Sequence, residues 1–214
     1  MNILEQFVIP PSQEHVGLLT VMQILSLLTF LPFAGLMLGA SVFSVYFNKK
    51  GKKTGNQVYV KIAKDIIDKL TVGKAAGFAL GILPLITIVL IYAQMLYGAK
   101  VISVSLLFLS LILFIISFIF VYNYKNAFQF ETIFDKFKNS PEISEDAKAY
   151  ERKVNYLGMR YGNWGVALLF ISSFLFIGST TIAAKPGIWT SVDNVLKLLL
   201  SAPIWVNYFF FLST

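Results

Sequence analysis

The sequence has 214 residues, of which 57% are hydrophobic and only 14% are charged, and its formal net charge is +7. A soluble domain carries about a quarter charged residues, and a chain of this size could not bury so much apolar surface in its own core, so a soluble globular protein is excluded. The absence of cysteine excludes disulfides, thiolate metal sites and a covalently attached c-type haem within these residues.

Four apolar segments are long enough to cross a bilayer, which needs about 20 residues. They cover about residues 16–47, 72–97, 101–124 and 164–184. Pro32 lies inside the first segment and Pro84 in the middle of the second. A proline inside a helix removes a hydrogen bond, so a kink or tilt is expected at each.

A fifth apolar segment covers residues 195–214 and ends without a polar flank. Spanning helices usually end in interfacial or charged residues. The segment is therefore either a complete short terminal helix or the start of a helix in a chain that continues beyond Thr214, and the second reading is favoured. The predicted fold is an all-α, polytopic transmembrane helical bundle, a single domain over residues 1–214 with four full spans and a fifth C-terminal helix.

Basic residues are concentrated on one side of these spans. Segments 48–74 and 124–163 hold fifteen of the eighteen lysines and arginines, against three on the opposite side. The positive-inside rule then places loops 48–71 and 125–163 in the cytoplasm and the N-terminus outside. Because these lysines lie beside hydrophobic spans, membrane topology explains them better than nucleic-acid binding.

The basic loops also contain helical patterns. Apolar residues recur at helical spacing in residues 56–70, which predicts an interfacial helix; a solvated connector is the alternative. The third span is expected to continue as a helix until Ser140 and Pro141 break it. Another helix begins near Ser144 and runs into the fourth span.

Small and polar residues inside the spans predict how the helices pack. Close helix approach is expected at Gly35, Gly39, Gly77 and Gly81. Interhelical hydrogen bonds are the expected role of the polar residues at membrane depth, which include Gln23, Ser26, Thr29, Thr87, Gln94, Ser110, Ser117, Ser172 and Ser173.

Residues that carry chemistry are rare in this sequence. The spans hold no aspartate or glutamate, and His15 is the one histidine, so no catalytic or metal-binding residue is predicted. A quinone needs only an apolar slot and one or two hydrogen-bond partners. The candidates for that weak role are His15, Tyr92 and Gln94.

Three stretches together resemble the start of the large haem-bearing subunit of cytochrome bd-type quinol oxidases. They are the first span LLTFLPFAGLMLGASVFSVYF, the link TGNQVYVKIAKDIIDKLTVGK and the phrase GFALGI that opens the second span. The later SAPIWVNYFFFL is similar to the start of that family's fifth helix. The resemblance covers about residues 16–97 and the C-terminal segment.

The family's haem and acidic positions are not matched. Thr29 and Asn207 stand where the family has haem-ligating histidines, and the second span lacks the family's glutamate. The resemblance therefore implies a bd-oxidase-like scaffold without haems.

The function expected from this is a haem-less membrane subunit or anchor of a respiratory electron-transfer complex in the bacterial inner membrane. It would not be catalytic by itself, and haem would sit in partner subunits. Membrane lipids and other subunits, including c-type cytochromes, are the expected partners. The alternatives are a transporter or channel component, favoured by the prolines in the spans, and a quinone-binding redox subunit.

Overall fold

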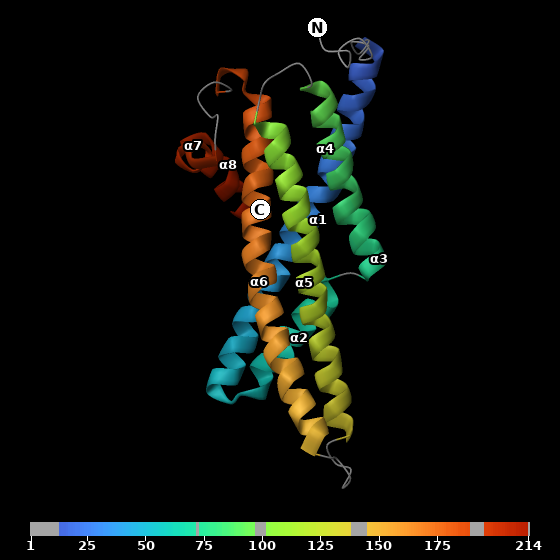
Figure 1. Cartoon of the computed structure of the whole chain (residues 1–214), viewed down its shortest axis with the longest axis vertical. Coiled ribbons are helices and arrows are strands. Elements are labelled where there is room, and N and C mark those ends of the chain that lie inside the picture. Colours follow the sequence, from blue (N-terminus) through green and yellow to red (C-terminus); the bar gives the residue numbers. More distant parts are fainter. Residues whose placement is uncertain (1–12, 72, 97–101, 138–144, 189–194, 214) are drawn as a thin grey trace.

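The computed structural model describes residues 13–71, 73–96, 102–137, 145–188 and 195–213, and the regular structure within them is helical. Three long helices form the body of the molecule: α1 (Gln13–Thr54), α5 (Ser103–Phe137) and α6 (Glu145–Ala184). Figure 1 shows α5 and α6 side by side along the long axis, with α1 crossing obliquely behind them. The predicted all-α fold is confirmed for these residues.

Four helices are long and apolar enough to cross a membrane: Glu14–Thr54, Lys74–Met95, Ser103–Phe130 and Arg152–Ala184. The 42 residues of α1 extend about 63 Å at 1.5 Å per residue, roughly twice the ~30 Å hydrocarbon thickness. The long helices therefore continue well beyond the apolar layer. The predicted break at Ser140 and Pro141 lies outside the described residues.

The prediction of a single fifth helix over residues 195–214 is wrong. The chain forms two short helices, α7 (Val195–Leu200) and α8 (Ala202–Ser213), separated at Ser201. Pro203 lacks an N–H and suits only the first turn of α8. The 12 residues of α8 cover about 18 Å, too short to span a bilayer. Both helices pack against α6, with Leu198 and Ile204 fully buried.

The second span is interrupted by a widened turn. It consists of α3 (Lys74–Gly77), the π-helical turn η2 (Phe78–Ile82), the 13-residue α4 (Leu83–Met95) and the turn residue Leu96. The Leu83 N–H donates to the carbonyl of Phe78, five residues earlier. Because Pro84 cannot donate and its ring crowds the preceding turn, this wide turn accommodates it within a continuous helical path. α1 likewise continues through Pro32.

The helix predicted for residues 56–70 is present as α2 (Gln57–Leu70). Gly55, with φ of +67°, makes the sharp turn after α1, and the Asn56 side chain caps the new helix by accepting from the Val58 N–H at 2.9 Å. Its buried residues, Ala63 and Ile67, belong to the core that includes α1. The apolar side of α2 thus packs on protein.

A lysine of α5 holds the other end of α2. Lys125 Nζ donates to the carbonyl of Thr71 at 2.7 Å and to that of Asp68 at 3.2 Å. A cation at a helix C-terminus satisfies orphan carbonyls and complements the helix dipole. The segment predicted as a cytoplasmic loop is therefore folded onto the bundle.

Helices α5 and α6 meet along a row of small residues spaced seven apart, here called the serine seam. The seam serines of α5 are fully buried, and each donates to a backbone carbonyl of α6. The hydroxyls of Ser103, Ser110 and Ser117 donate to the carbonyls of Ser179, Ser172 and Gly165 at 2.7, 2.8 and 2.7 Å. The predicted interhelical role of Ser110 and Ser117 is confirmed.

The prediction of close helix approach is confirmed at two of the four glycines and wrong at the other two. A Cβ on Gly77 would lie 2.5 Å from Tyr122 Oη, and one on Gly81 would clash with Phe33, so close approach is confirmed there. A Cβ on Gly35 or Gly39 would meet nothing within 4 Å. The prediction of close approach at these two positions is wrong within the described part of the chain, because the space beside each is open.

This contrast predicts opposite effects of the same substitution. Gly77→Leu should destabilise the protein by about 1–3 kcal/mol, because the side chain must displace Phe118 and Tyr122. Gly35→Leu should cost nothing or stabilise slightly, because leucine is the better helix former and the space is open. Thermal unfolding of both variants in detergent checks the difference; equal destabilisation would contradict the packing described here.

Candidate functional site

The three cofactor candidates lie on two neighbouring helices and form hydrogen bonds there. Gln94 Nε2 and His15 Nε2 lie 2.7 Å apart, and Gln23 Nε2 donates to Tyr92 Oη at 2.8 Å. Both bonds join α1 to the second span near the N-terminal end of α1. These side chains therefore tie two helices together, a common role of polar residues between membrane helices; quinone binding at this place stays a prediction.

The residues that stand at haem positions in the resemblance to cytochrome bd-type oxidases bond within the chain. Thr29 Oγ1 donates to the Leu25 carbonyl at 2.9 Å, and Asn207 Nδ2 donates to Thr181 Oγ1 at 2.9 Å. Among the described residues, no group of three or more His, Asp or Glu side chains could hold a metal ion.

A small apolar cavity, with room for about one water molecule, lies between α1, α5 and α6. Phe30, Leu38 and Phe114 contribute to its wall together with serines of α5 and α6. The serine hydroxyls bond elsewhere: Ser110 donates to a backbone carbonyl, and Ser173 pairs with the Tyr208 hydroxyl at 3.2 Å. The cavity offers an apolar space without an acid, a base or a nucleophile.

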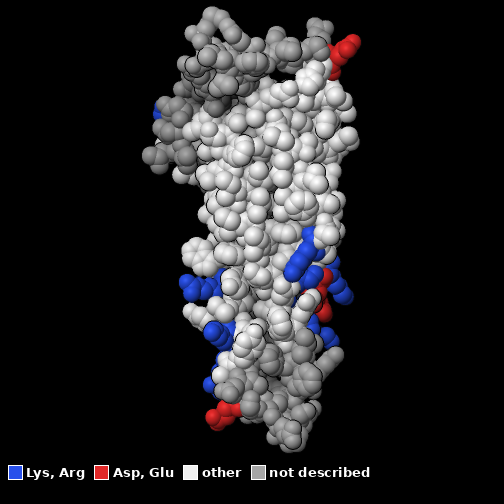
Figure 2. Space-filling view, turned by 45° about the vertical axis from the view of Figure 1, so that its right-hand side comes forward, with Lys and Arg blue, Asp and Glu red and all other residues white. Residues whose placement is uncertain are grey.

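The basic end of the bundle holds a buried polar network and a second pocket. We use the term basic end for the part of the molecule that carries Lys49, Lys50, Lys52, Lys53, Lys125, Arg152, Lys153 and Arg160. In Figure 2 the blue side chains gather in this lower part, below a broad band without charged residues.

Four hydrogen bonds connect helices across this end. Ser44 Oγ donates to the Ala63 carbonyl at 2.7 Å and lies 3.1 Å from Tyr124 Oη. Asn48 Nδ2 donates to Tyr124 Oη and to Met159 Sδ, both at 3.2 Å. The network thereby joins α1 to α2, α5 and α6.

The direction of each hydrogen bond follows from the number of protons that each side chain can donate. Ser44 has one hydroxyl proton and gives it to Ala63, so Tyr124 must be the donor in its bond with Ser44. Tyr124 can then only accept from Asn48, which requires the amide nitrogen to face it. This orientation leaves Asn48 Oδ1 as an acceptor, and it has no hydrogen-bond partner among the described residues.

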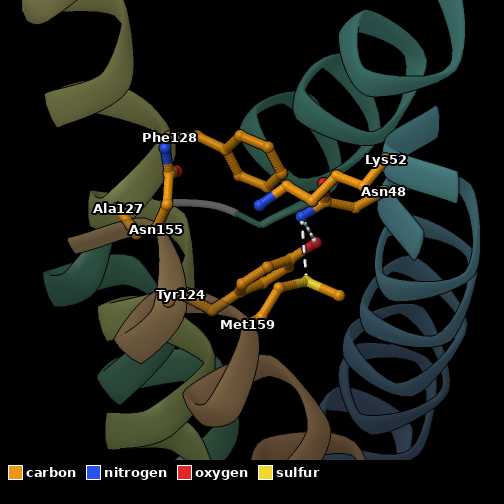
Figure 3. Close-up of a pocket in the computed structure, with 8 residues that line it drawn as sticks. Asn48, Lys52, Tyr124, Ala127, Phe128, Asn155 and Met159 are labelled. Carbon is orange, nitrogen blue, oxygen red and sulfur yellow. Dashed lines mark hydrogen bonds between the residues drawn. The ribbon is translucent and has the colours of Figure 1, made fainter. Parts of the chain in front are cut away.

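This acceptor borders a small, partly open pocket between α1, α5 and α6. Figure 3 shows Lys52 extending across it from α1, with Asn155 of α6 on the opposite side. The rest of the lining comes from α5 and α6: Tyr124, Ala127, Phe128, Gly158 and Met159. Asn48 is only 2% exposed, so its side chain belongs to the wall of the pocket.

Sequence reasoning missed this site because Asn48 stood at the predicted boundary of span and loop. The available signal was a polar stripe at intervals of four residues, Ser44, Asn48 and Lys52, on a helix that continues past the membrane. Tyr124 was the last residue of the predicted third span, and nothing in the sequence indicated its hydrogen bonds with Ser44 and Asn48.

No protein-family model matches this chain, and its comparison with curated proteins and with solved structures gives no match.

Proposed function

We propose that this chain is a haem-less integral membrane subunit that anchors other subunits of a respiratory electron-transfer complex. The observation that carries the proposal is the uncovered pair Gly35 and Gly39 on α1. Glycine in a helix interior costs about 1 kcal/mol relative to alanine. Glycines 77, 81, 162, 165 and 178 lie against neighbouring helices, whereas this pair has no neighbour in the described part of the chain.

Close helix contacts in membranes use small residues at four-residue spacing. A helix of a partner subunit would pack on α1 at Gly35 and Gly39. The same helix exposes large apolar side chains, with Leu25 59% and Leu28 67% exposed. Lipid can cover those side chains, but lipid gives no reason for two glycines one turn apart.

The respiratory setting is supported by the resemblance to the haem-bearing subunit of cytochrome bd-type oxidases in the first two spans. The basic end supports an orientation in the bacterial inner membrane with the N-terminus outside. Haem would sit in partner subunits, such as c-type cytochromes. The transporter and quinone alternatives have no comparable support: the apolar cavity lacks charged lining residues, and the quinone candidates bond to one another or to Gln23.

The test is purification of the native complex under mild conditions, with identification of every co-migrating chain and an absorption spectrum for haem. We expect partner subunits, with haem assigned to them. Gly39→Leu should lower the recovery of partners at least several-fold while this chain stays folded. Gly187→Leu is the matched control, since Gly187 also has nothing within 4 Å. A chain that purifies alone, or partners retained by Gly39→Leu, would overturn the proposal.

A further inference from the structure

The pocket at the basic end has a depth that matches the surface of a bilayer. Ser103 to Tyr124 covers 22 residues of α5, or about 33 Å at 1.5 Å per residue. This is close to the ~30 Å thickness of the hydrocarbon layer. With Ser103 near one boundary, Tyr124 reaches the other, where phospholipid phosphates lie.

The polar groups in the pocket form a complementary pair. Lys52 lies one helical turn after Asn48, so both side chains stand on the same face of α1, and the Lys52 ammonium lies over the pocket in Figure 3. The ammonium attracts an anion, whereas the buried Asn48 Oδ1 needs a hydrogen-bond donor. A ligand that satisfies both must carry a negative group and an N–H or O–H group close together.

The size of the pocket limits the ligand further. Its enclosed part holds about one water molecule, so a single N–H or O–H group of a ligand can enter it while a nucleotide cannot. The surrounding lysines and arginines add a general attraction for anionic lipid near a membrane surface.

We propose that this pocket binds the headgroup of a phospholipid that carries a hydrogen-bond donor, such as an ethanolamine or glycerol headgroup. The phosphate pairs with the Lys52 ammonium, and the headgroup N–H or O–H donates to Asn48 Oδ1. A choline headgroup offers the same phosphate but has no N–H, so it leaves the acceptor unsatisfied. This inference requires a membrane location and is independent of any partner subunit.

The experiment measures lipid retained by the purified full chain after delipidation and incubation with phosphatidylethanolamine or phosphatidylcholine, using native mass spectrometry. Wild type should retain at least fivefold more of the ethanolamine lipid. Lys52→Gln should reduce this preference to less than twofold. Lys53→Gln is the matched control: it removes the same charge one residue away, from a side chain that does not line the pocket, and should keep the preference.

Several outcomes would overturn the proposal. One is equal retention of both lipids by wild type, and another is equal loss in the two lysine variants, which would indicate only a general surface charge. Inorganic phosphate is the third ligand to be tested. If it raises the unfolding temperature of the delipidated protein as much as phosphatidylethanolamine does, the ligand is free phosphate and the lipid assignment is wrong.

Discussion

Replacing Gly158 by alanine is expected to destabilise the bundle, although alanine is the better helix former. A Cβ at this position would lie 2.5 Å from the Cβ of Ala127, and neither atom can rotate away. Helices α5 and α6 would have to separate, at a cost of about 1–3 kcal/mol for overpacking. Alanine recovers only about 1 kcal/mol through its helix propensity, so the net change should be a loss of stability.

A compensating substitution distinguishes the contact from other causes. Ala127→Gly removes the opposing Cβ, so the double variant should return close to wild-type stability, since one glycine and one alanine are simply exchanged. Gly35→Ala is the control with open surroundings and should be neutral or slightly stabilising. Reversible unfolding of the four variants in detergent gives the coupling energy. A double variant no more stable than Gly158→Ala would contradict the close packing of α5 and α6.

The serine seam also shows how much of the fold could be predicted from the sequence. Composition located the four spans because only hydrophobic helices satisfy their backbone inside a bilayer. The position of Ser110 and Ser117 inside the apolar spans also identified them as interhelical residues. The seven-residue spacing was present in the sequence, with Gly158 in step with the α6 serines, but the small residues carry little hydrophobic signal and no repeat was recognised.

Other features depended on which side of a helix meets a neighbour. Gly35 and Gly77 have similar sequence surroundings, yet only Gly77 packs against another helix. The division of the C-terminal segment at Ser201 required α7 and α8 to fold onto α6. Tertiary contacts determine these features. The periodicity of residues along the sequence does not specify which helix faces will meet.

Removing the Tyr124 hydroxyl should show how much the hydrogen-bond network at the basic end contributes to the stability of the fold. Tyr124→Phe keeps the ring, which packs edge-on against Phe128 at a centroid distance of 5.1 Å. It removes the group that donates to Ser44 and accepts from Asn48. The buried Asn48 amide would keep only the weak sulfur acceptor of Met159, at a cost of about 1–3 kcal/mol.

A double-mutant cycle makes this prediction specific. Replacing both partners of a buried hydrogen bond by apolar groups can be nearly neutral, so Asn48→Leu should cost less in the Tyr124→Phe background than in wild type. Tyr156→Phe is the control, since Tyr156 of α6 is 68% exposed and the loss of its hydroxyl should cost little. Additive effects of Asn48→Leu and Tyr124→Phe would contradict the network.

The same substitution connects stability with ligand preference. Tyr124 Oη accepts a hydrogen bond from the Asn48 amide and thereby holds Oδ1 toward the pocket. Without the hydroxyl the amide can turn over, and the pocket then presents a donor where it presented an acceptor. Tyr124→Phe should therefore lose the preference for a donor-bearing headgroup while Lys52 still attracts the phosphate. Total lipid retention should change little, whereas the ratio of ethanolamine to choline lipid should fall toward one.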